Sequence, residues 1–328
     1  MLGQRNEDDI VDKKLNVAVL YGGDGPEREV SLKSGAAVVS ALEEAGFKVV
    51  PFDITDLSQL SDLRKTGHID SVFIALHGSW GEDGRVQSAL DVLRLPYSGS
   101  GPLACCLSMD KAATKGLLNL FGVPTPEGVL VLKGSSFSLE KARHFAERHH
   151  SVVVKPCNGG STLGVTVVHN SQGLSDAFNE AWKYDSRCVI EKYIDGVDLA
   201  VTVWKQKGYL EALPEVMICP EKGFYDYDSK YTPGKTRYIV PAPFDPSIRS
   251  DIHQMACRAF EALSCEGYAR VDFRVEEKGT PWVLEVNTAP GMTGTSLTPK
   301  AAAAAGYDFP AFLSHVVCLS LEKKSACR

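Results

Sequence analysis

The sequence predicts a protein of mixed class, with an α/β region on a parallel sheet followed by an α+β region on antiparallel strands. Three observations predict this. Between residues 16 and 76, short apolar strands and a helix follow one another in the order β-α-β-β, which is typical of a parallel sheet. From Asp110 onward, short strands and helices alternate again and a glycine-rich turn separates two of the strands. Near the C-terminus, two apolar strands flank the turn Glu276–Thr280, which indicates a hairpin.

Length and composition exclude several classes of protein. The chain has 328 residues, of which 44% are hydrophobic and 23% charged, so we expect roughly two or three domains with a large core. No apolar run approaches the ~20 residues that span a bilayer, and the polar, acidic N-terminus lacks the features of a signal or transit peptide. A net charge of −6 argues against nucleic acid as a partner. Nine cysteines without a CxxC pair indicate reduced thiols, and we expect a cytoplasmic protein with no membrane partner.

The N-terminal region is predicted to form a β-α-β-β unit. Glycines end its first strand and its helix, and apolar residues in the helix repeat at helical spacing. In order, the elements are strand Asn16–Tyr21, helix Glu29–Gly46, strand Phe47–Phe52 and strand Ser71–Leu76.

In the rest of the chain, short strands and helices follow one another. The polar stretch from Pro220 to Thr236 is too long for an ordinary turn, and it is either a functional lid or a disordered loop. The expected elements are helix Lys111–Phe121, strand Gly128–Leu132, helix Leu139–His149, strands Ser151–Lys155, Val165–Val168, Cys188–Glu191 and Leu199–Trp204, helix Pro246–Leu263, and strands Gly267–Val275 and Trp282–Asn287.

The C-terminal hairpin carries the most informative polar residues. Arg270 and Asp272 are two apart on one strand, and Glu285 and Asn287 are two apart on the next, so each pair shares a face. Their neighbours Val271, Phe273, Leu284 and Val286 then face the core. Carboxylate and amide oxygens suit Mg²⁺ bound together with substrate phosphates. The alternative is a solvent-exposed sheet face with chance polar residues.

A strand also delivers Lys155 to the glycine-rich segment that ends at Gly164. Such a loop lets backbone N–H groups approach phosphate oxygens, although the Walker A order is absent. A plain hairpin turn is the alternative.

Two further segments leave their function open. Leu20–Glu29 lies where open α/β sheets place ligands, but Arg28 breaks the dinucleotide fingerprint. Glu27 either stabilises the helix dipole or binds an ammonium group. Gly223–Tyr231, with three tyrosines and a lysine, is a lid over a charged ligand or a solvated loop. Three more residues are, taken singly, ordinary surface or satisfied polar groups: Lys111, Lys192 and His77.

Together these segments resemble the D-alanine–D-alanine ligases of the ATP-grasp superfamily. The matching segments, in the order of that family, are GGDGPEREVSLKSG, FIALHGSWGEDG, PYSGSG, MDKAATK, VVVKPCNGGSTLG, VIEKYIDG, FYDYDSKY, GYARVDF and LEVNTAPGMTGTSL. The resemblance implies a three-domain ATP-grasp architecture. An N-terminal parallel-sheet (pre-ATP-grasp) substrate domain would span 1–105, a central ATP-grasp subdomain 106–192, and a C-terminal subdomain 193–328 with a lid loop at 220–236.

The resemblance also implies an activity. Members join two D-alanines to D-alanyl-D-alanine through a D-alanyl phosphate, using ATP and two Mg²⁺ ions, for which Mn²⁺ can substitute. The product serves peptidoglycan and cell-wall synthesis, and homodimers are usual. A ligase that makes the ester D-alanyl-D-lactate is an alternative, although Tyr231 favours the amide. A nucleotide-binding protein without ligase activity is another, and an NAD-dependent or hydrolase-like enzyme is the weakest.

The resemblance assigns residues to the nucleotide and its metal ions. Asp272, Glu285 and Asn287 would hold the metal. Lys111, Lys155 and Lys230 would lie along the phosphates. Glu191, Lys192 and Ile194 would meet the adenine, and Asp198 the ribose, where members usually carry Glu.

It assigns a second set of residues to the amino-acid substrates. Glu27 would bind the ammonium group of the first D-alanine, with His77 close to it. Arg270 and the backbone N–H of Gly291 would form the oxyanion hole. Ser296 and Leu297 would hold the carboxylate of the second D-alanine. Ser161 and Tyr231 would be hydrogen-bonded with Glu27.

Overall fold

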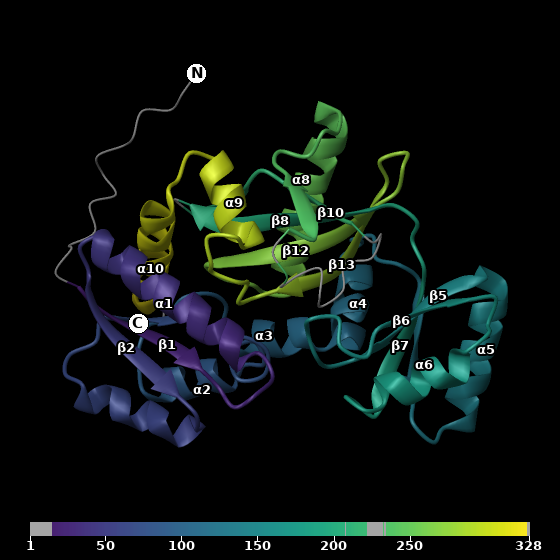
Figure 1. Ribbon diagram of the computed structural model, residues 1–328, viewed down its shortest axis with the longest axis horizontal. Helices are drawn as coiled ribbons and strands as arrows, with labels where there is room; N and C mark the ends of the chain where they lie inside the picture. The colour runs from purple at the N-terminus through teal and green to yellow at the C-terminus, as the bar shows by residue number, and fades with distance from the viewer. Residues whose placement is uncertain (1–14, 207, 222–231, 233, 327–328) are drawn as a thin grey trace.

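The computed structural model describes residues 15–206, 208–221, 232 and 234–326, and within them the strands form three sheets (Figure 1). The N-terminal sheet is parallel, as predicted. It contains β1 (Asn16–Gly22), β2 (Lys48–Ile54) and β3 (Ser71–Ile74) in the order β2-β1-β3.

Alternate residues of this sheet enter two different cores. Val17, Val19 and Phe73 pack against α1 (Arg28–Glu44) and against α10 (Phe309–Ala326), which returns from the far end of the chain. On the other face, Ala18, Leu20 and Val72 pack against the 3-10 helix η2 (Leu57–Lys65) and α2 (Arg85–Val92). The period-2 alternation of strands therefore explains why this sheet is covered on both sides.

The central sheet is antiparallel and has its own core. Its strands β4 (Gly128–Leu132), β7 (Arg187–Lys192), β5 (Ser151–Pro156) and β6 (Thr166–His169) follow in that order. Two helices, α5 (Ser136–His149) and α6 (Leu174–Ala181), pack against it. Two further helices, α3 (Pro102–Met109) and α4 (Lys111–Leu120), precede this sheet in the chain.

The C-terminal sheet is also antiparallel, and residues of its long strand β8 alternate between two helical layers. Leu199, Val201 and Val203 face the core that contains α8 (Pro246–Ala262). Ala200 and Trp204 face the core shared with α9 (Leu297–Ala304) and α10. Five strands, β11 (Thr236–Ile239), β10 (Val216–Pro220), β8 (Val197–Gln206), β12 (Tyr268–Val275) and β13 (Pro281–Asn287), lie in that order, and β9 (Tyr209–Ala212) pairs with β8.

The expectation for Leu284 was wrong. The register of β12 and β13 shifts by a β-bulge between Asp272 and Phe273, so that Phe273 lies opposite Val283. Val283 is fully buried in the core, whereas Leu284 lines a pocket beside Glu285. Strict alternation along β13 would have buried Leu284 in the core and turned Val283 toward the pocket.

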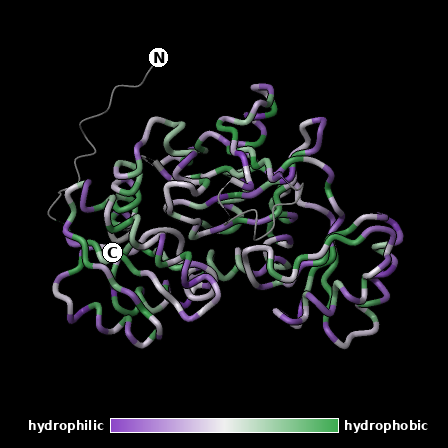
Figure 2. The backbone as a smooth tube through the Cα atoms, in the orientation of Figure 1, coloured by the Kyte–Doolittle hydropathy of each residue, from purple (hydrophilic) through white to green (hydrophobic). Residues whose placement is uncertain are grey.

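The sequence analysis predicted the long elements as far as β13 and did not predict several short ones. The helices η2, α2, α3 and α6 and the strands β9, β10 and β11 were not predicted. Figure 2 shows hydrophobic stretches along the strands of the N-terminal and central sheets. No single helix among the described residues is long and apolar enough to cross a membrane. Only the bent pair α9 and α10, at 103° to each other, passes by length and composition.

Candidate functional site

Two adjoining pockets lie where the three sheets meet. The larger is a cavity of about 590 Å³, lined by residues from α1, the glycine-rich loop, the β12–β13 hairpin and the start of α9. The smaller, of about 150 Å³, lies between the central and C-terminal sheets. Residues common to both linings include Lys111, Gly160, Arg270 and Glu285, so the two pockets form one cleft.

The polar residues of the hairpin share one face, as predicted. Asp272 lies directly across from Glu285, and Arg270 lies across from Asn287. Arg270 donates from Nε to Asp272 Oδ1 and from Nη2 to Oδ2, both at 2.7 Å. All four residues line the cleft.

The chemistry of this donor set fits a hard divalent cation. Asp272 and Glu285 supply carboxylate oxygens, and Asn287 supplies an amide oxygen. Mg²⁺ is commonly bound by one or two carboxylates and completes its shell with water and phosphate oxygens. No group of three or more His, Cys, Asp or Glu residues in the described part of the chain is arranged to hold a metal ion, so the ligand itself would have to complete the shell.

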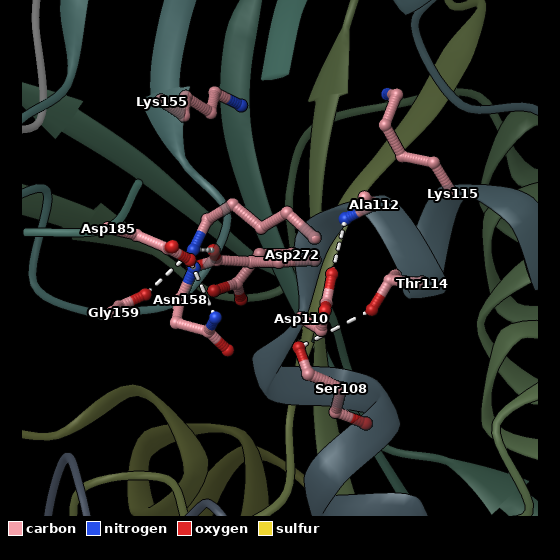
Figure 3. Close-up of polar contacts among 12 residues, drawn as sticks. Ser108, Asp110, Ala112, Thr114, Lys115, Lys155, Asn158, Gly159, Asp185 and Asp272 are labelled. Atoms are coloured by element: carbon pink, nitrogen blue, oxygen red, sulfur yellow. Dashed lines mark hydrogen bonds and ion pairs between the residues drawn. The ribbon is translucent and has the colours of Figure 1, made fainter. Parts of the chain in front are cut away.

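Polar contacts tie the glycine-rich loop to its surroundings. Asp185 Oδ2 accepts from the backbone N–H of Asn158 at 3.0 Å and from its Nδ2 at 2.6 Å (Figure 3). Arg187 donates to Asp110 at 2.8 Å, and Asp110 in turn caps the N-terminus of α4. Lys111 Nζ donates to the carbonyl of Gly159 at 2.7 Å. The base of the loop is therefore held by Asp185, which lies just before β7, and by Lys111 of α4.

The far part of this loop reaches the N-terminal domain. Ser161 adopts a positive φ of 52°, and its hydroxyl donates to Glu27 Oε1. The second oxygen of Glu27 lies so close to Gly78 that a Cβ there would be 2.0 Å from it. The structure thus brings together Glu27 and Ser161, which are 134 residues apart in the sequence.

Two further titratable groups lie in the same corner. Ser34 Oγ and His77 Nε2 form a hydrogen bond of 2.8 Å. Burial, with a contribution from Arg270, lowers the pKa of His77 to about 4. Glu82 accepts from the backbone N–H of Gly78 at 2.9 Å. Burial and the neighbouring Glu27 raise the pKa of Glu82 to about 8. The imidazole is therefore neutral near pH 7, and the Glu82 carboxyl is protonated.

The smaller pocket contains the residues expected at the nucleotide. Glu191 is buried, and its carboxylate is paired with Lys155 at 2.9 Å and Lys115 at 3.4 Å. Asp198 is paired with Arg274 at 2.8 Å. Lys192 and Ile194 also line this pocket.

The N-terminus of α9 faces the larger pocket. Ser296 Oγ accepts from the backbone N–H of Thr293 at 3.1 Å, and Gly291 lies so close that a Cβ there would be 3.0 Å from it. Gly291, Ser296 and Leu297 line the pocket together. The first N–H groups of a helix and its dipole favour an anion at such a position.

Sequence reasoning missed two residues of the cleft and one residue beside it, and two predicted residues lie outside the described residues. The missed residues are Glu82, Lys115 and Arg274. Glu82 and Lys115 lie within segments that match the family. The only signals for them were that Glu82 follows His77 by five residues and that Lys115 follows Lys111 by four. Lys230 and Tyr231, and most of the expected lid, lie outside the described residues.

Comparisons with known proteins agree on one family. A family model described as D-ala D-ala ligase C-terminus matches residues 117–318, and one described as D-ala D-ala ligase N-terminus matches 55–100. A D-alanine–D-alanine ligase of Syntrophotalea carbinolica is 43% identical over 306 residues, covering 93% of this chain and 96% of the relative. The crystal structure of D-alanine–D-alanine ligase from Bacillus anthracis is similar, with a TM-score of 0.83, 32% identity and coverage of 96% and 100%. The crystal structure of that ligase complexed with ATP is also similar, with a TM-score of 0.82, 31% identity and the same coverage of both chains.

Proposed function

The chain belongs to the D-alanine–D-alanine ligase family, and on this premise we propose that it condenses two D-alanines into D-alanyl-D-alanine while ATP is cleaved to ADP and phosphate. One observation carries this proposal most directly. The Glu27–Ser161 contact, the polar face of the hairpin and the N-terminus of α9 line one cavity, and that cavity adjoins a pocket rich in lysines. Two amino-acid sites and a triphosphate site would thus lie side by side.

The chemistry requires activation because a carboxylate is a poor electrophile. A carboxylate oxygen of the first D-alanine attacks the γ-phosphorus, the bond from that phosphorus to the bridging oxygen breaks, and ADP leaves. We assign Lys111 and Lys155 to the charge on the phosphates, because both line the smaller pocket. Glu27 would hold the ammonium group of the first D-alanine.

The acyl phosphate is then captured by the second D-alanine. Its amine attacks the carbonyl carbon, the C–O bond to phosphate breaks, and phosphate leaves. Arg270 and the N–H of Gly291 are suited to stabilise the oxyanion, since both line the same cavity. Ser296 and the backbone of Leu297 would bind the second carboxylate at the start of α9. The Glu27–Ser161 pair would help remove the amine proton, and the hydrogen bond between them supports this assignment.

The cation implied by the family would be held by Asp272, Glu285 and Asn287. Two Mg²⁺ ions at this position would neutralise charge on the β- and γ-phosphates. Asp272 forms an ion pair with Arg270, so its negative charge is already compensated before any cation binds.

We further propose a cytoplasmic homodimer, and the division of the chain at residues 105 and 192 also stays a proposal. A second copy would cover exposed apolar side chains of α2, α3 and the end of α4: Val92, Leu103, Leu120 and Phe121, with exposed fractions of 84%, 64%, 77% and 51%. Light scattering after size-exclusion chromatography tests the dimer, and a monomeric mass at micromolar concentration contradicts it.

Phosphate release tests the function. We expect the purified protein to release phosphate from ATP only when D-alanine and Mg²⁺ are both present, with D-alanyl-D-alanine identified by mass. The phosphoryl acceptor must occupy the cleft before transfer, so L-alanine is the matched control, and EDTA should stop the reaction. Equal turnover with L-alanine, or phosphate release without dipeptide, would contradict the proposal.

A further inference from the structure

We propose that Lys115 is a positioning residue: it is the permanent counter-ion of Glu191, and it thereby leaves Lys155 available to bind phosphate oxygens. The inference rests on the proposed function only in taking a nucleoside triphosphate as the ligand of the smaller pocket. Lys115 itself does not line either pocket, so it acts through its neighbours.

The two lysines reach Glu191 from different elements. Lys155 comes from β5 of the central sheet, and its Nζ lies 2.9 Å from Glu191 Oε2. Lys115 comes from α4, and its Nζ lies 3.4 Å from Glu191 Oε1 and 3.1 Å from Thr125 Oγ1. In Figure 3, the side chains of Lys155 and Lys115 extend from two different elements toward the space between them. Each oxygen of the carboxylate therefore has an ammonium group within ion-pair distance, and the hydrogen bond is the one that Lys155 donates to Oε2.

The position of Lys115 is built into the fold. Its side chain is only 8% exposed, and burying an ammonium group without a partner is costly. Gly128, the first residue of β4, gives it room: a Cβ there would lie 3.1 Å from Lys115 Cε and 2.9 Å from the carbonyl oxygen of Ile190. Any larger residue at 128 would press on the lysine stem or on β7. A glycine at a strand's first position thus has a specific structural reason.

The charges of the cluster explain why two lysines are present. Glu191 is 1% exposed, so the carboxylate needs a cation at all times. If Lys155 were that cation alone, moving its ammonium toward a phosphate would leave a buried, uncompensated carboxylate. With Lys115 in place, Lys155 can change partners while Glu191 stays neutralised. Before the nucleotide binds, one carboxylate faces two ammonium groups, and the surplus positive charge attracts the triphosphate.

The ionisation of the three groups is consistent with this assignment. Burial by itself would raise the pKa of Glu191, but Lys115 and Lys155 hold it below its usual value. Burial lowers the pKa of Lys115, and Glu191 opposes that shift. Burial also acts to lower the pKa of Lys155, but Glu191, with Glu285 and Asp198, outweighs it and raises the pKa. Glu191 thus offsets the effect of burial on the charge of both lysines.

Binding of two ligands separates this role from a structural one. In Lys115→Met, we expect the affinity for a non-hydrolysable ATP analogue with Mg²⁺ to fall at least tenfold, because Lys155 is retained by Glu191. The affinity for adenosine, which has no phosphates, should change less than threefold. Isothermal titration calorimetry measures both. Lys115→Arg should recover most of the loss, and Lys183→Met, which removes an exposed lysine paired only with Glu180 on the surface, is the control and should change neither.

A second variant keeps the test decisive if Lys115→Met folds poorly. In a Glu191→Gln background the carboxylate is absent, so adding Lys115→Met should leave the affinity for the ATP analogue unchanged within twofold. An equal loss for adenosine and the ATP analogue, no loss for either, or a full tenfold loss in the Glu191→Gln background would overturn the inference. These measurements need no turnover. A failure of D-alanine-dependent phosphate release therefore contradicts the proposed function and leaves this inference standing.

Discussion

The N-terminal and central sheets differ in how each is joined to the C-terminal sheet. One core contains residues of β1, β3 and α1 together with residues of β8, α9 and α10, so the first and last parts of the chain share their interior. The core of the central sheet is drawn only from residues between 129 and 190. The contacts described above that join the central sheet to the rest are polar: Ser161–Glu27, Arg187–Asp110, Lys111–Gly159 and Lys115–Glu191.

This difference separates stability from function. The N-terminal and C-terminal parts are held by apolar burial, which is non-directional and large in sum. The central region is positioned by hydrogen bonds and ion pairs, whose geometry is specific and whose net contribution is smaller. Substitutions in the shared core should therefore reduce stability, whereas substitutions at the polar contacts should reduce activity.

The largest effect is expected for Phe312→Ala. Phe312 is fully buried in the shared core and packs against Trp204 and Tyr268. Its truncation should lower the free energy of unfolding by about 3–5 kcal/mol. Hydrogen exchange should show the N-terminal and C-terminal sheets losing protection together while β5 and β7 lose less. Equal loss in the central sheet would contradict the separation of cores.

A smaller effect, on activity, is expected for Ser161→Ala. The change removes the hydroxyl that donates to Glu27 across the cleft. We expect kcat/KM for D-alanine to fall roughly 10–100-fold, about 1.4–2.7 kcal/mol. The free energy of unfolding should change by less than about 1 kcal/mol, measured by urea denaturation. Ser135→Ala, at the cap of α5, is the matched serine control, since it touches no part of the cleft. A stability loss without an activity loss would reverse the roles assigned here.

A pH-dependent effect on stability is expected for Glu82→Gln. The folded-state pKa of Glu82 is raised to about 8 from the ordinary 4.5, so folding takes up a proton between these values. Glu82 therefore lowers the stability of the wild-type protein progressively as pH rises from about 4.5 to 8. Glutamine keeps an acceptor for the N–H of Gly78 and removes the titration. We expect the variant and wild type to be equally stable at pH 4 and the variant to become progressively more stable than wild type as pH rises to 9, by at most about 5 kcal/mol. A stability difference between variant and wild type that does not change with pH would contradict the raised pKa of Glu82.

Much of this molecule was predictable because its signals are local. The period-2 placement of Arg270, Asp272, Glu285 and Asn287 holds in the structure, since strand alternation depends only on neighbouring residues. Leu284 was misplaced because the bulge beside Asp272 follows from packing across the sheet. The elements η2, α2, α3 and α6 were missed because short segments carry too few residues to show a period.

By itself, the sequence determined the residue types of the site, the strands and loops that carry them, and the family to which those segments belong. Only the tertiary structure decided which of these residues meet. Glu27 contacts Ser161 and Glu191 is shared by two lysines because helices and sheets pack in one arrangement. Helix and strand periods are set by the backbone of each segment, whereas the burial and pairing of charges depend on distances between elements that are remote in the chain.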